Sequence, residues 1–220
     1  NAKASFATQA TIFRRKHNWL MCVLYLGTFG SFIGYAAGFP LLIKSQFPSV
    51  NALAYAWLGP LIGAVVRPFG GWLSDKLGGA TVTFWNFVVM AGAVVGVLYF
   101  LPSGPSGGNF TGFFLMFLVL FFTTGIGNGS TFRMIPVIFL NEALARVNQN
   151  DPQAKAAAIK EGNTEGAATL GFTAAMAAYG GFFIPKSYGT SITMTGGPEA
   201  ALYVFIVFYL VCIGITWWFY

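Results

Sequence analysis

The sequence is poor in charged residues and in cysteine. Asp, Glu, Lys and Arg together make up only 8% of its 220 residues, whereas soluble domains carry about a quarter. The two cysteines, Cys22 and Cys212, lie inside apolar stretches, where a free thiol behaves as a small hydrophobe. The scarcity of charge excludes an ordinary soluble domain, and the cysteines carry no information about redox chemistry.

Residue clusters that perform catalysis are also missing from the sequence. It contains no visible metal-ligand cluster, no nucleophile beside a base and no phosphate-binding loop, so we expect neither an enzyme nor a bound cofactor. The net charge of +6 invites a nucleic-acid interpretation, but the basic residues are spread over loops rather than gathered on one face. We therefore expect no nucleic-acid partner.

Long apolar stretches are what the sequence does contain. Six of them approach or exceed the roughly 20 residues that cross a bilayer as a helix. They are residues 19–42, 52–73, 82–101, 110–139, 167–184 and 200–220. None alternates with the period of two that a membrane β-barrel strand requires. The sequence predicts an all-α membrane protein with six transmembrane helices in the lipid bilayer.

The basic residues predict how these helices are oriented. With six spans, both termini share one side of the membrane with the loops 74–81 and 140–166. That side carries most of the cations, namely Lys3, Arg14, Arg15, Lys16, Lys76, Arg146, Lys155 and Lys160, and the other side carries Lys44 and Lys186. Positively charged loops remain in the cytoplasm, so we expect cytoplasmic termini. Residues 1–18 would form a cytoplasmic linker and residues 19–220 a six-helix bundle.

An internal similarity indicates a repeat of three helices. Residues 26–34, LGTFGSFIG, weakly resemble residues 124–132, TGIGNGSTF, in the first and fourth apolar stretches. Inverted repeats of this kind are common in transporters, where the substrate site lies near the midplane at which they meet. A six-helix unit of this type is usually half of a twelve-helix carrier. Because the chain starts without methionine and ends within an apolar stretch, we expect a C-terminal half.

The most informative charged residue is Arg67, deep in the second apolar stretch. It continues a stripe of Gly59, Gly63 and Gly71 at four-residue intervals along one helix face. An arginine at the centre of a span costs about 2.5–3.5 kcal/mol and usually faces a cavity or a partner. None of the six acids falls within the six stretches, and Asp75 is about 12 Å away along the helix axis. A transported anion would supply the missing charge; snorkelling to the interface, or pairing with an acid outside this chain, is the alternative.

Three other features accompany this arginine. Tyr25 and Phe29 lie one helical turn apart, a spacing typical of packing that could also wall a flat ligand. The fifth stretch has small residues on nearly one face, including Gly171, which would allow tight helix packing or leave room for an anion. Arg133 lies late in the fourth stretch, and we expect its side chain to snorkel to the interface.

Residues 70–79, GGWLSDKLGG, resemble the conserved loop that follows the second helix of each half in the major facilitator superfamily. The resemblance implies a twelve-helix facilitator fold with 3+3 inverted repeats. It also implies a gating role, rather than substrate binding, for Asp75 and its loop neighbours Gly71 and Lys76. In that superfamily the aspartate contacts a neighbouring helix terminus and helps to hold the outward-open state.

Three longer segments are similar to the C-terminal half of the nitrate/nitrite porter family. They are LYLGTFGSFIGYAAGF (24–39), GNGSTFRMIPVIF (127–139) and GFTAAMAAYGGFFIPKSYG (171–189). The resemblance implies that Arg67 binds the substrate anion and that Tyr25 and Phe29 line its site. Gly171 would belong to the signature helix and lie beside the substrate site, and Gly180 and Gly181 would belong to the same helix. It further implies nitrate and nitrite as substrates, an N-terminal six-helix half as partner and a bacterial inner membrane as location.

Three functions remain open at this point. The leading interpretation is exchange of nitrate for nitrite by alternating access, because the spans offer no acid for proton coupling. Proton-coupled nitrate symport is the second possibility. A six-helix anion channel or a membrane scaffold is the third, although a channel would more naturally surround a symmetric pore with charges or carbonyls.

Overall fold

The computed structural model describes residues 9–148 and 150–220, and this part of the chain is helical, without a strand. Six helical stretches in it are long and apolar enough to cross a membrane. The chain is a multi-pass, all-α membrane protein. Residues 1–8 of the expected linker, Lys3 included, lie outside the described residues.

The first membrane span contains a change of helix type. It runs from α2 (Lys16–Tyr25) through a π-helix, η2 (Leu26–Gly30), into α3 (Ser31–Gln46). A short 3-10 helix, η1 (Ala10–Arg14), precedes it. The other helices are α4 (Ala52–Tyr55), α5 (Leu58–Leu77), α6 (Gly79–Phe100), α7 (Phe110–Ala145), α8 (Pro152–Ala178), α9 (Gly180–Thr195) and α10 (Glu199–Phe219). Together α4 and α5 form the second span, and α8 and α9 the fifth.

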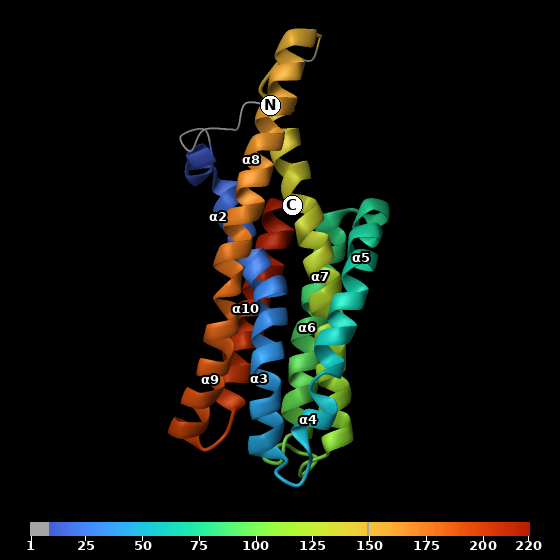
Figure 1. Ribbon diagram of the computed structural model, residues 1–220, viewed down its shortest axis with the longest axis vertical. Coiled ribbons are helices and arrows are strands. Elements are labelled where there is room, and N and C mark those ends of the chain that lie inside the picture. Colours follow the sequence, from blue (N-terminus) through green and yellow to red (C-terminus); the bar gives the residue numbers. More distant parts are fainter. Residues whose placement is uncertain (1–8, 149) are drawn as a thin grey trace.

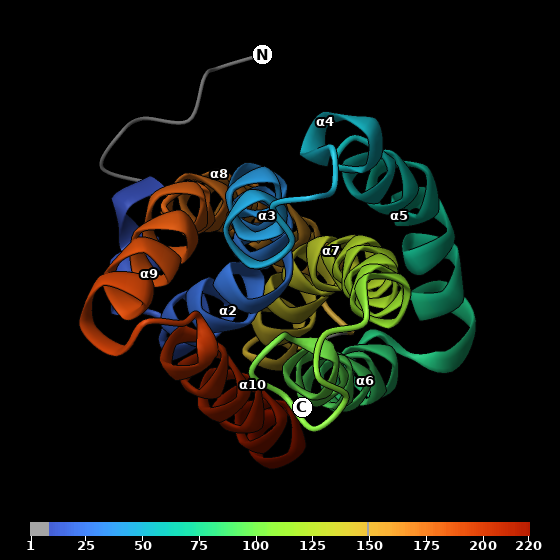
Figure 2. The same ribbon diagram turned by 90° about the horizontal axis from the view of Figure 1, so that it is seen from below.

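The spans run side by side and alternate in direction (Figure 1). The helix η1 and the end of α10 lie at the same end of the bundle, as an even number of spans requires. Figure 2, seen along the bundle, places α2 and α7 inside a ring formed by the other helices. The helix α7 packs against α5, α6 and α8 and therefore lies at the centre of the fold.

Glycines allow α5 and α7 to approach closely. A methyl group added to Gly63 would meet the carbonyl oxygen of Phe121, and one added to Gly70 would meet the backbone of Ile126. From the other side, a methyl group on Gly129 would strike the carbonyl oxygen of Arg67. Small residues of this kind let helix backbones pack tightly in a membrane. The closest neighbour of the glycine stripe is therefore α7.

The interior between α3 and α7 is filled with aromatic rings. Phe39 lies with its ring centroid 4.5 Å from that of Phe117 and 5.7 Å from that of Phe121. Tyr35, also buried, packs edge-on against Phe117 at 5.8 Å. Offset and edge-to-face arrangements are the preferred ones for such rings. The centre of this six-helix unit is therefore a packed core.

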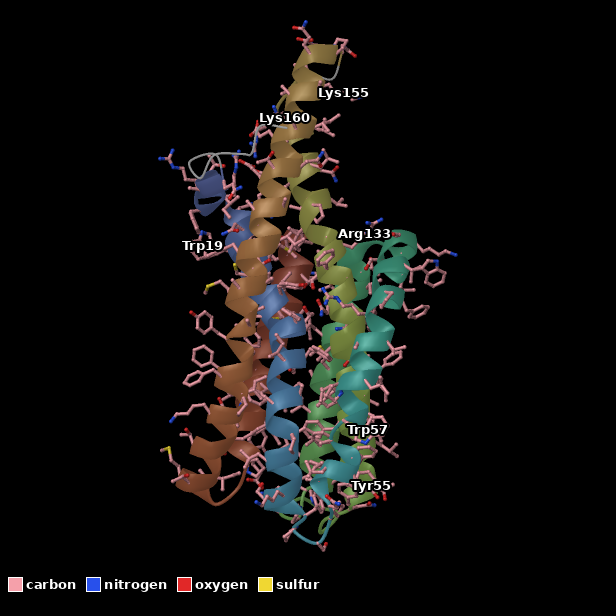
Figure 3. All side chains as sticks on the ribbon, viewed as in Figure 1. Trp19, Tyr55, Trp57, Arg133, Lys155 and Lys160 are labelled. Carbon is pink, nitrogen blue, oxygen red and sulfur yellow. The ribbon has the colours of Figure 1, made fainter. Side chains whose placement is uncertain are left out.

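Two predictions about the spans were wrong. The fifth stretch, expected at 167–184, belongs to two helices that meet at Tyr179, because α8 ends at Ala178 and α9 begins at Gly180. The loop expected at 140–166 is mostly helix, since α7 continues to Ala145 and α8 starts at Pro152. The helices α7 and α8 extend beyond the ends of their neighbours, where Lys155 and Lys160 are labelled in Figure 3. Because α8 is continuous, an acid thought to lie in the loop, Glu165, is buried within it.

Candidate functional site

Arg67 lies close to two aromatic rings. Its guanidinium carbon is 5.6 Å from the centroid of Phe29 and 5.5 Å from the centroid of Phe132. Both distances are within the range of a cation–π interaction. The side chain is half-buried, and it makes no ion pair with any acid among residues 9–148 and 150–220. The site therefore holds a cation whose charge is not neutralised within the described part of the chain.

The position of the first ring depends on the π-helix. Phe29 lies within η2 and stacks on Tyr25, with ring centroids 5.3 Å apart and an angle of 26° between the planes. Tyr25 is itself 1% exposed, so it supports the ring from inside the bundle. Short π-helical turns occur frequently at functional sites. The two aromatic residues singled out in the sequence and Arg67 are thus brought together.

The second ring was not identified from the sequence. Phe132 lies on α7, and its neighbour Arg133 drew attention instead because it is charged. A lone phenylalanine in an apolar helix gives no signal for a site, and only the packing of α5 on α7 brings it to Arg67. The contact between Gly129 and the backbone of Arg67 fixes this packing one turn before Phe132.

Arg133, which was expected to snorkel to the interface, is exposed and pairs with Asp75. Its Nε donates to one carboxylate oxygen of Asp75 at 2.7 Å and its Nη2 to the other at 3.1 Å. This bidentate ion pair joins the end of α5 to α7, at the place labelled Arg133 in Figure 3. Lys76 instead lies over the ring of Trp72, with its Nζ 4.4 Å from the centroid.

The glycines of the expected gating loop and signature helix lie in different surroundings. A methyl group on Gly71 would have only the carbonyl oxygen of Gly129 within reach, at 3.9 Å. One on Gly180 would strike the carbonyl oxygen of Gly30, at the end of the π-helix. Gly181 packs against the Ile33 side chain. The fifth span therefore touches the first beside Phe29 through Gly180.

Gly171 does not join this contact. It is exposed on α8, and a methyl group placed on it would have nothing within 4 Å. It lines a groove of about 890 Å³ together with Lys160, Asn163 and Phe172. Neither Arg67 nor Phe29 lines that groove.

A second charged cluster, which the sequence did not reveal, joins η1 to α8. The guanidinium of Arg15 donates to Glu165 at 2.8 Å and to Glu161 at 3.1 Å, and Glu161 also pairs with Arg146 at 3.3 Å. The Glu165 side chain is only 5% exposed. The hydrogen bond with Glu165 raises the pKa of the Arg15 guanidinium above its ordinary value.

Aromatic rings hold the same segment on its other side. Phe13 meets Phe172 of α8 edge-on with centroids 5.0 Å apart, and Trp19 meets it at 5.8 Å. The indole of Trp19 donates to the carbonyl oxygen of Phe13 at 3.1 Å. The segment before the first span is thus docked on α8.

No group of three or more potential metal ligands lies within the described residues.

Comparison with known proteins relates the chain to transporters. The chain is 49% identical over 221 residues to "Nitrate/nitrite transporter NarU" of Escherichia coli and 48% identical over 220 residues to NarU of Salmonella typhimurium. It is 37% identical over 223 residues to "Probable nitrate/nitrite antiporter NarK2" of Thermus thermophilus. These alignments cover 99% of this chain and 46%, 46% and 45% of the three relatives, so the chain spans about half of their length. No family model matches.

Proposed function

The chain belongs to the nitrate/nitrite transporter family, as the homologue of one half of its members, and we propose that it is the C-terminal half of a carrier that moves nitrate and nitrite across a bacterial inner membrane. The carrier works by alternating access between two six-helix halves. Its relatives are named as transporters and not as enzymes.

The observation that carries this proposal is the unneutralised charge of Arg67 close to two rings. Nitrate is planar and spreads its charge over its oxygens, and a guanidinium can donate two parallel hydrogen bonds to such an anion. Phe29 and Phe132, whose centroids lie 5.6 and 5.5 Å from the guanidinium carbon, would then flank a flat ligand bound to the cation. The ring of Tyr25 supports Phe29 from inside. Arg67 therefore binds the anion, and the rings wall its site.

The partner of this half is a second six-helix half of the same protein. The relatives are about twice as long as the chain. The second and fifth spans are the least buried of the six, at 17% and 28% of their apolar windows. On α5 the exposed apolar side chains Leu61, Val65 and Phe69 follow each other at four-residue intervals. We assign this unpaired face of α5 to contacts with the other half, which would also complete the anion site.

The gating role of Asp75 rests on its ion pair with Arg133 at the end of α5. The pair joins the second span to the fourth, and Gly71 and Lys76 flank it on the same helix. A change in this pair would alter how α5 moves relative to α7 without touching the anion. Asp75, Gly71 and Lys76 are therefore assigned to gating.

The orientation and the linker follow from the charge distribution. The cation-rich end of the bundle, which carries η1 and the end of α10 (Figure 1), would face the cytoplasm by the positive-inside rule. Residues 1–18 would then connect the two halves on that side, with η1 fixed to α8 by Arg15. Residues 19–220 would form the six-helix bundle of this half, the first helical span of which already begins at Lys16.

Exchange of nitrate for nitrite is favoured over proton-coupled symport. One of the relatives is named as a probable antiporter. In addition, Arg67 provides one anion site without a titratable acid beside it. A channel is disfavoured because rings such as Phe39 and Phe117 fill the interior of this half.

Exchange and symport are separated by transport into liposomes that contain the complete carrier. We expect nitrate uptake when the liposomes are loaded with nitrite, and little uptake when they are empty, even under an inward proton gradient. Uptake into empty liposomes that follows the proton gradient would establish symport instead. Loss of nitrate transport under every condition would refute the proposed function.

A further inference from the structure

A hydrogen bond between two threonines connects the two rings beside Arg67. Thr28 precedes Phe29 in the π-helix, and Thr131 precedes Phe132 on α7. Their hydroxyl oxygens are 2.9 Å apart, and both residues are fully buried. The bond therefore joins the two backbone segments that present the rings to the guanidinium.

The neighbouring carbonyl groups indicate which hydroxyl donates. Thr131 lies 2.7 Å from the carbonyl oxygen of Gly127 in its own helix, so its single proton is directed there. The oxygen of Thr131 is then free to accept. Thr28 is 3.3 and 3.4 Å from the carbonyl oxygens of Leu24 and Tyr25, longer than its 2.9 Å to Thr131. The arrangement is a chain in which Thr28 donates to Thr131 and Thr131 donates to Gly127.

Close packing surrounds this bond. A methyl group on Gly127 would come within 2.6 Å of the methyl carbon of Thr28. The π-helix therefore lies directly against α7 at this level, and the hydroxyl pair is enclosed where water cannot replace a lost partner. Without Thr131, the Thr28 hydroxyl would keep as acceptors only the longer contacts with the carbonyl oxygens of Leu24 and Tyr25, at 3.3 and 3.4 Å, and would be released from α7.

The bond acts on a segment whose helix type can change. A π-turn contains one residue more than an α-turn, and one residue corresponds to a rotation of about 100° around the helix. Return of residues 26–30 to an α-helix would turn Phe29 away from Arg67. A partner that holds Thr28 in place therefore also holds the ring.

We propose that Thr131 is a positioning residue for anion binding, whose hydroxyl fixes the π-helix through Thr28 and thereby keeps Phe29 facing Arg67. In this role its hydroxyl acts through Thr28 and not directly on the anion. The proposal rests on the proposed function, because the ring matters only if an anion binds at Arg67.

Three variants of the complete carrier test this role. Thr131→Val keeps the shape of the side chain and removes the hydroxyl, whereas Thr131→Ser keeps the hydroxyl. Thr124→Val is the matched control, because Thr124 is also fully buried on α7 and its hydroxyl, within residues 9–148 and 150–220, bonds only to the carbonyl oxygen of Phe121 in its own helix, at 2.9 Å. Nitrate binding is measured by calorimetry, and thermal stability is measured in parallel.

We expect Thr131→Val to weaken nitrate binding about tenfold, which corresponds to about 1.4 kcal/mol. Thr131→Ser and Thr124→Val should stay within about twofold of wild type. In a double-mutant cycle, adding Thr28→Val to Thr131→Val should cause little further loss, because both changes remove the same bond.

The outcomes distinguish the two proposals. Absence of nitrate binding by the wild-type carrier would refute the proposed function itself. Wild-type binding together with equal affinities for Thr131→Val and Thr124→Val would overturn the positioning role alone. Equal losses of affinity in these two variants, in step with their losses of stability, would also overturn it, because the effect would then be a general structural one. Failure of Thr131→Ser to retain affinity would likewise contradict a role for the hydroxyl.

Discussion

Replacing Arg67 with lysine keeps the positive charge and removes the geometry. In the structure the guanidinium carbon lies 5.6 and 5.5 Å from the centroids of Phe29 and Phe132. A planar guanidinium can stack on such rings and still present two donors at its edge, whereas an ammonium is a compact, strongly hydrated point charge. We therefore expect Arg67→Lys to abolish or severely reduce nitrate transport.

The size of the effect follows from the contacts that are lost. Loss of one charge-assisted hydrogen bond to nitrate corresponds to about 1.5–3 kcal/mol, and weaker interaction with the two rings adds a fraction of the roughly 0.5–1 kcal/mol typical of an exposed cation–π contact. Nitrate affinity should fall by about tenfold to a hundredfold. If Arg67 only snorkelled to the interface, lysine would serve almost equally well.

The assay is nitrate binding and uptake by the complete carrier, after insertion and folding of the variant have been verified. Arg14→Lys is the matched control, because Arg14 is an exposed arginine of η1, far in sequence from the site. Near wild-type binding and uptake by Arg67→Lys would refute its role in substrate binding. The anion site would then have to be sought in the other half.

Two further predictions concern gating and packing. Asp75→Asn should slow or bias the transport cycle with nitrate affinity nearly unchanged, because it weakens the ion pair with Arg133 rather than the anion site; equal loss of rate and affinity would contradict this. Gly180→Ala should lower the stability of the carrier by about 1–3 kcal/mol, because its methyl group would strike the carbonyl oxygen of Gly30. Gly171→Ala should change stability by about 0.5 kcal/mol or less, and thermal unfolding that ranked the two glycine variants the other way would refute this account.

The membrane fold was predictable because it depends on composition over long windows. Six apolar stretches led to six expected spans, and residues 9–148 and 150–220 contain six helical stretches long and apolar enough to cross a membrane. The boundaries were less predictable, because hydropathy locates the apolar part of a helix and not its ends. The helix α8 begins at Pro152, well before the apolar stretch expected at 167–184, since polar residues continue the helix beyond its apolar part.

The parts of the site that depend on local backbone geometry could not be predicted. Hydropathy and residue spacing do not distinguish a π-turn from an α-turn, so the π-helix at Leu26–Gly30 had no signal. Phe132 and Thr131 are ordinary members of an apolar helix until α5 packs against them. Arg67 could be singled out from the sequence because an arginine in an apolar span is unusual whatever surrounds it, and its role in binding the anion stays a prediction.

Glu165 changes the argument about proton coupling, which assumed that no acid lies within the spans. This carboxylate is 3% exposed and belongs to a helix that forms part of the fifth span. However, it accepts three hydrogen bonds from Arg15, and it lies near the middle of α8, where it pairs with the residue that follows η1 rather than with Arg67. An acid that carries protons must release its partner in each cycle, and release here would leave the Arg15 charge without its main counter-charge. The geometry therefore favours a fixed role for Glu165 in docking η1 on α8, and exchange remains the better-supported mode of transport.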